Sequence, residues 1–313
     1  MKKFSLLALS AAVLLASGLT ATDGWAKTLR LGHIRATNHP THEAALKFKE
    51  ILEAKSNGAY TVKVYPNSQL GNPKEMFVQL QTGDLEMVYG GINTFAWIKG
   101  ASAFEITAIP FLFRDYDHMK KSLDSDFFKP IIAKAEKETG IKLVAISGDT
   151  TPRGLSTKGR AVKSAADFKG LKIRTAASPT VLRAMKTLGA MPQQIPFAEL
   201  YMALKTGVVD AQENGAMVVW AKSLHEVQDY YVQTDYIRDI ETFYMSGDTW
   251  ADLPQADQKM ISDAAETAGV FETEQLLEQI EQLLDTRQTE ELRALLAERH
   301  PADLAEVLGR LSH

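Results

Sequence analysis

Two arginines, Arg153 and Arg174, are the residues of this chain best suited to binding chemistry. Arg174 ends the strand-like stretch 171–173, and Arg153 lies in the polar segment 148–152 or directly after it. A guanidinium at a strand end can hold a carboxylate through two parallel hydrogen bonds, which lysine cannot do. Spacing alone also allows the commoner role of an arginine, an ion pair on the protein surface.

Four further residues are candidates for a binding pocket. Asn214 follows a strand-like segment and could offer its amide to a ligand or serve in a turn. The aromatic candidates for an apolar pocket wall are Phe197, Trp220 and Tyr244. Because core packing is the commoner role of any single aromatic residue, the pattern leaves both roles open.

Metal-binding and catalytic chemistry have less support. His33, His39 and His42 fall close together, but no acidic ligand accompanies them, so we expect them to cap and flank a helix start rather than bind zinc. The chain has no cysteine, which excludes disulfides, thiolate nucleophiles and thiolate metal sites. Phosphate-binding glycine motifs and a Gly-x-Ser-x-Gly nucleophile elbow are missing too. We therefore expect no enzyme activity, no cofactor and no metal site.

The elements that would position these residues alternate between strands and helices. Apolar periodicity predicts strands over 29–34, 61–65 and 85–89, and helices from 40 to near 58 and from 73 to 82. Asn72 is a favourable helix cap, and Pro73 suits the first helical position. This alternation predicts an α/β fold with largely parallel sheets.

A repeated unit indicates two lobes. The stretch 80–87 is echoed by 204–211, and in each a Thr-Gly pair ends a helix and leads into a strand. Gly83 and Gly207 are expected to adopt a positive φ there. The repeat predicts two α/β lobes, 27–150 and 151–239, with a ligand cleft between them.

The length, the net charge and the N-terminal residues limit the possible domain organisation, partners and cellular location. A chain of 313 residues is too long for one small core, and a net charge of -4 gives no basic face for nucleic acid. Lys2 and Lys3 precede an apolar run over 6–16 and small residues up to Ala26. This pattern predicts a signal peptide over 1–26 and export to the periplasm; cleavage after Ala21 and a buried N-terminal helix are the alternatives. No later segment is long and apolar enough to cross a membrane.

Four collinear stretches carry a family resemblance: 65–71 (YPNSQLG), 169–174 (KGLKIR), 197–204 (FAELYMAL) and 209–214 (VDAQEN). Residues 27 to about 270 resemble the DctP-type solute-binding subunits of TRAP (tripartite ATP-independent periplasmic) transporters. The resemblance implies a two-lobed periplasmic binding protein fold that closes like a hinge, with part of 240–272 returning to the first lobe. It also implies a monomer that captures a small organic acid and delivers it to the TRAP membrane subunits.

The same resemblance assigns roles to the candidate residues. It implies that Arg174 pairs with the ligand carboxylate, that Arg153 assists, that Asn214 supplies an amide contact and that Phe197 walls the pocket. Sialic-acid binders of similar sequence carry a glutamate near 90–91 and an asparagine near 177, where this chain has Gly90-Gly91 and Ala177. That departure favours a less decorated acid, aliphatic or aromatic.

The C-terminal residues depart from the family. Residues 273–313 are predicted to form an atypical helical tail, and 295–306 resembles the start of the N-terminal domain of MgtE-type magnesium transporters. A chance likeness between amphipathic helices is the alternative. The competing functions are accordingly a chimeric product with impaired binding, a magnesium-linked sensor, and an enzyme on the same fold.

Overall fold

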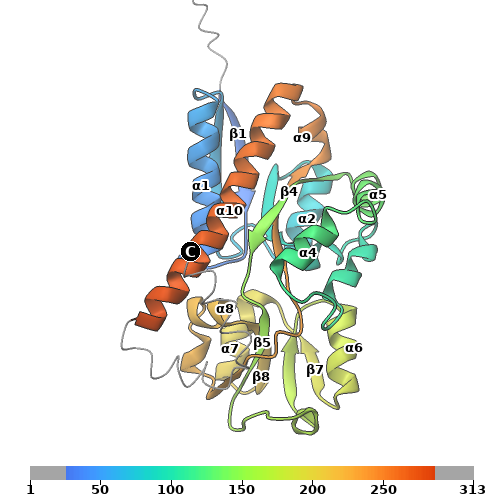
Figure 1. Cartoon of the computed structure of the whole chain (residues 1–313), viewed down its shortest axis with the longest axis vertical. Helices are drawn as coiled ribbons and strands as arrows, with labels where there is room; N and C mark the ends of the chain where they lie inside the picture. Colours follow the sequence, from blue (N-terminus) through green and yellow to red (C-terminus); the bar gives the residue numbers. More distant parts are fainter. Residues whose placement is uncertain (1–25, 286–313) are drawn as a thin grey trace, which may run out of the picture.

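The computed structural model describes residues 26–285, which form two α/β lobes, one above the other in Figure 1. The first sheet has the strand order β2 (Tyr60–Tyr65), β1 (Lys27–Gly32), β3 (Met87–Gly91), β10 (Ile240–Ser246) and β4 (Ile141–Asp149). The second has the order β7 (Met191–Gln194), β6 (Lys172–Thr175), β8 (Ala211–Gly215), β5 (Arg153–Thr157) and β9 (Tyr230–Val232). The α/β class and the two-lobed architecture are confirmed.

Both sheets are mixed rather than largely parallel. β1 runs parallel to β2 and β3, and β6 runs parallel to β7 and β8. β10 is antiparallel to β3 and β4, and β5 is antiparallel to β8 and β9. The antiparallel strands are the two that enter directly from the other lobe, so each sheet repeats the pattern of three parallel strands followed by one crossing strand.

Helices cover the sheets on both sides. The first lobe carries α1 (Pro40–Lys55), α2 (Pro73–Thr82), α3 (Ile92–Phe95), α4 (Tyr116–Leu123), α5 (Lys129–Thr139), α9 (Gly247–Ala251) and α10 (Gln255–Asp285). The second lobe carries α6 (Pro179–Thr187), α7 (Leu200–Lys205) and α8 (Ala216–Ala221). Short 3-10 helices occupy Ser102–Ala108, Ala165–Phe168, Phe197–Glu199 and Leu224–Glu226.

Local sequence signals determine where several of these helices begin and end. Asn72 caps α2 through a reciprocal pair of hydrogen bonds with Glu75, of 3.1 and 2.8 Å, and Pro73 opens the helix. Gly83 and Gly207 both have positive φ, 75° and 74°, as predicted for the repeated helix ends. The buried strand β10 shows why both faces of the first sheet are apolar: Tyr244 packs in one core cluster and Phe243 in the other.

The long helix α10 packs against β4 and α1 and is drawn in orange to red in Figure 1. Its contact face uses small residues: Ala264, Ala265 and Ala268 are fully buried, and Gly269 lies against Ser147. α10 runs unbroken to Asp285, so the described part of the predicted tail, 273–285, continues this helix. The signal peptide (1–26) and the MgtE-like stretch (295–306) fall, apart from Ala26, outside the described residues. Within 26–285 no helix has the length and apolarity needed to span a membrane.

Candidate functional site

A cavity of about 330 Å³ lies between the two lobes. The first lobe lines it with residues from the ends of β1 and β3 and the start of β10, and the second lobe with residues from the ends of β6 and β8. Apolar side chains make up much of the wall. Four of the six predicted site residues line the cavity: Arg153, Arg174, Phe197 and Asn214.

Arg174 is the central cation of the second lobe. Its side chain, 3% exposed, extends from β6, and its Nε donates to the Ile195 carbonyl oxygen at 2.9 Å. Burial lowers the pKa of this guanidinium to about 10; the negative charge of Glu213 opposes the shift, and the positive charge of Arg153 adds to it. Among the described residues no carboxylate forms an ion pair with it. A buried cation without a directly bound carboxylate is unfavourable, so the site favours an anion at this position.

Arg153 is held differently. Its Nε and one terminal nitrogen bind the two carboxylate oxygens of Glu213 at 2.5 and 2.8 Å, and the same nitrogen donates to the Glu213 carbonyl oxygen at 2.9 Å. Tyr236 donates its hydroxyl to Glu213 at 2.5 Å. The pKa of Arg153 is therefore raised although burial acts to lower it. Arg153 is already paired with Glu213, and its positive charge contributes to the electrostatic potential at Arg174.

Phe197 and Asn214 complete the predicted set at the cavity. The Phe197 ring lies between cations: the guanidinium carbons of Arg35 and Arg174 are each 5.9 Å from its centroid, and Lys222 Nζ is 4.8 Å away. An aromatic face stabilises such charges while walling the pocket. Asn214 Nδ2 donates to Gln212 Oε1 at 2.7 Å, which fixes the amide orientation.

Trp220 and Tyr244 lie elsewhere, outside the cavity lining. Trp220 stacks on His225 with centroids 4.7 Å apart. Tyr244 is fully buried in the first-lobe core, where its ring meets Phe77 edge-on at 4.9 Å. Tyr244 occupies the face of β10 that packs on α2 and α3 and is not among the residues that line the cavity. Both residues are removed from the proposed binding set.

Sequence reasoning missed a second arginine pair, Arg35 with Glu241. Arg35 follows β1, and its Nε and a terminal nitrogen bind Glu241 Oε1 at 3.2 and 2.8 Å. The other carboxylate oxygen of Glu241 is buried and has no hydrogen-bond partner among the described residues. The position of Arg35 was the available signal, because it lies close to the end of β1, as Arg174 lies close to the end of β6.

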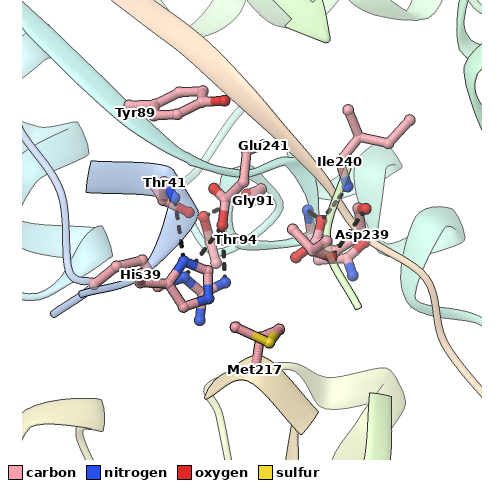
Figure 2. A network of polar contacts seen from close by, with 12 residues as sticks. His39, Thr41, Tyr89, Gly91, Thr94, Met217, Asp239, Ile240 and Glu241 are labelled. Atoms are coloured by element: carbon pink, nitrogen blue, oxygen red, sulfur yellow. Dashed lines mark hydrogen bonds and ion pairs between the residues drawn. The ribbon is translucent and has the colours of Figure 1, made fainter. Parts of the chain in front are cut away.

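Asp239 is the second missed residue. It precedes β10, lines the cavity, and accepts backbone N–H groups of Asn93 and Ile240 at 3.1 and 3.0 Å through one oxygen. Burial, and then the charge of Glu241, raise the pKa of Asp239 to about 7. A Cβ at Gly91 would overlap the other Asp239 oxygen, so any larger residue there would displace the Asp239 side chain. Figure 2 shows Asp239 just before β10 and Glu241 on this strand, with Met217 of the second lobe below them. The cavity therefore has an acidic wall that the sequence did not predict.

Behind this wall lies Glu272 of α10. It is fully buried and receives hydrogen bonds from Tyr89 and, at 2.5 Å, from the Thr41 hydroxyl. Burial and the neighbouring Glu241 raise the pKa of Glu272 to about 8, against the opposing influence of Arg35 and the two hydroxyl donors. Glu272 thus ties α10 to β3 and α1, and its raised pKa favours the protonated form.

The three histidines serve the local structure. His39 caps α1 by accepting from Thr41 N at 3.2 Å, and His33 Nε2 lies 3.0 Å from His42 Nδ1. Burial lowers the pKa of His33 to about 3, which keeps it neutral. In the part of the chain that the structure describes, no group of three or more histidine or acidic residues could hold a metal ion.

Two similar α/β lobes with a ligand-sized cavity between them are the architecture of bacterial solute-binding proteins. The model of the bacterial extracellular solute-binding protein family 7 (DctP) matches residues 31–307, and the chain belongs to this family.

Relatives of known name or structure agree with this assignment. The chain is 32% identical over 260 residues to the 2,3-diketo-L-gulonate-binding periplasmic protein of Escherichia coli, covering 83% of this chain and 78% of that protein. A TRAP periplasmic solute-binding protein of Haemophilus influenzae, solved with L-gulonate, is similar with a TM-score of 0.76 and 31% identity over 83% of this chain and 84% of that one. A protein of the same class from Shewanella oneidensis, solved with succinate, has a TM-score of 0.76 and 26% identity over 83% and 85%.

Proposed function

We propose that this protein is a periplasmic solute-binding protein that captures a small organic acid between its lobes and delivers it to TRAP membrane subunits. The ligand carboxylate binds Arg174, with Arg153 strengthening the positive field, Phe197 walling the pocket and Asn214 offering polar contact. We infer that the protein acts as a monomer, without catalysis, and reaches the periplasm through the signal peptide over 1–26.

The observation that carries this proposal is the state of Arg174. It is a cavity-lining guanidinium, 3% exposed, with no carboxylate partner among the described residues. Its neighbour Arg153, by contrast, is bound by Glu213 through both oxygens. A bidentate pair with a ligand carboxylate would supply the missing counter-charge at a site from which closure excludes water.

A thermal-unfolding panel tests the proposal. The chain from Lys27 onward is melted with small carboxylic acids, each paired with its own carboxamide. At a hundred times its Kd, a bound acid stabilises the folded state by about 2.7 kcal/mol, while the amide does not. The variant Arg174→Gln should melt cooperatively and lose the shift, and the control Arg183→Gln, on the exposed side of α6, should keep it. Equal shifts with acids and amides, or an undiminished shift in Arg174→Gln, would contradict the proposal.

The family does not decide which acid is bound. The relatives above include one solved with a sugar monocarboxylate and one solved with a dicarboxylate, so the choice must come from this chain's own cavity.

A further inference from the structure

The cavity is charged asymmetrically. Three arginines line it, and two of them are already paired: Arg153 with Glu213, and Arg35 with Glu241. That leaves Arg174 on the second lobe, and Lys222, above the same Phe197 ring, adds positive charge on that side. The exposed Lys74 lies at the rim. Positive charge free to meet a ligand inside the cavity is therefore concentrated on the second lobe.

The first lobe presents the opposite sign. Asp239 and Glu241 both line the cavity from the start of β10. Arg35 binds only one oxygen of Glu241, and the other is buried without a hydrogen-bond partner among the described residues. Gly90, also in the lining, places no side chain before this oxygen, and a Cβ there would be 3.9 Å from it. This oxygen is closed to solvent, and its uncompensated negative charge repels an anion bound in the cavity.

Resting on the proposed function, we infer that Asp239 and Glu241 determine specificity: the ligand is a monocarboxylate whose far end is an uncharged hydrogen-bond donor, and a second carboxylate is rejected. The ligand carboxylate binds Arg174 of the second lobe. Its far end reaches the first lobe, where a hydroxyl or amide N–H lies beside the carboxylates of Asp239 and Glu241. A dicarboxylate would instead place its second charge against two buried acids, and like charges in such a site oppose binding strongly.

Matched ligand pairs test this inference. Calorimetric titrations at pH 8 compare succinate, glutarate and adipate with their mono-amides, so each pair differs only in one carboxylate. We expect the best mono-amide to bind at least about tenfold more tightly than its dicarboxylate. In Asp239→Asn, which preserves the oxygen that accepts the two backbone N–H groups, the dicarboxylate should gain about tenfold while the mono-amide changes little.

Two further variants sharpen the result. Glu241→Gln releases Arg35 as a second unpaired cation and should also favour the dicarboxylate. The control Asp126→Asn makes the same change in net charge at a side chain that is 96% exposed, and should leave the preference unaltered.

The outcomes separate this inference from the proposed function. A wild-type protein that binds a dicarboxylate as tightly as its mono-amide, through Arg174, overturns the inference and leaves the carboxylate-binding function intact. Unchanged discrimination in both Asp239→Asn and Glu241→Gln also overturns it. If none of the acids in the wider panel binds, the proposed function itself has failed.

Discussion

Replacing Glu213 by glutamine removes the counter-charge of Arg153 without changing the shape of the side chain much. Glu213 is fully buried, and its carboxylate receives two bonds from Arg153 and one from Tyr236. In the variant, two neighbouring guanidinium groups, those of Arg153 and Arg174, would share a site with no carboxylate between them.

The magnitude follows from that burial. Removing one partner of a buried ion pair lowers the free energy of unfolding by about 3–5 kcal/mol, because the remaining charge is left uncompensated. Since the Arg153 side chain is 16% exposed, water relieves part of this cost, and we expect the free energy of unfolding to fall by about 3 kcal/mol. An anionic ligand would supply a replacement charge, so ligand should restore more stability in Glu213→Gln than in the wild type.

Urea unfolding with and without ligand measures both effects. With a slope of about 3 kcal/mol per M, the midpoint of the ligand-free variant should fall by about 1 M. The control Asp263→Asn breaks the exposed pair with Lys259, whose side chains are 50% and 75% exposed, and should change the free energy by less than about 0.5 kcal/mol. If Glu213→Gln matches this control, or gains no extra stabilisation from ligand, the reasoning about compensated buried charge is wrong.

Two further predictions concern the acidic wall. Gly91→Ala forces a methyl group onto the Asp239 carboxylate and should lower the free energy of unfolding by about 1–3 kcal/mol in urea titrations; Gly90→Ala, which has room, is the control, and equal effects would contradict the prediction. Glu272 has a folded-state pKa of about 8 against an ordinary 4.5, so the folded protein binds the extra proton and loses stability as pH rises through that window. The free energy of unfolding of Glu272→Gln, measured relative to that of the wild type, should therefore rise by roughly 2–4 kcal/mol from pH 5 to pH 8. Parallel stability profiles for the two proteins would refute this.

The parts of the fold that the sequence predicted are those with local causes. The cap at Asn72 and the left-handed glycines Gly83 and Gly207 depend on neighbouring residues only, and all three were placed correctly. The direction of β10 could not be read from its composition, because it depends on the chain crossing back from the other lobe.

The same distinction between local and long-range causes applies to the residues of the candidate site. Arg174 was recognisable as a guanidinium at a strand end, but its missing counter-ion became visible only in the structure. The pair of Arg35 with Glu241 joins residues 206 positions apart, and no local pattern predicts such a contact. For Tyr244 the residue type fitted both core and pocket, and the face of β10 on which it lies decided for the core.

The most direct test of the central claim is a calorimetric titration of the best-binding acid into the wild-type protein and into Arg174→Lys. Lysine keeps the positive charge but cannot form two parallel hydrogen bonds to a carboxylate. We predict that the Kd rises about a hundredfold, corresponding to about 2.7 kcal/mol, while the variant unfolds at a similar temperature without ligand. A Kd within about threefold of wild type, which is less than about 1 kcal/mol, would show that the carboxylate does not bind at Arg174.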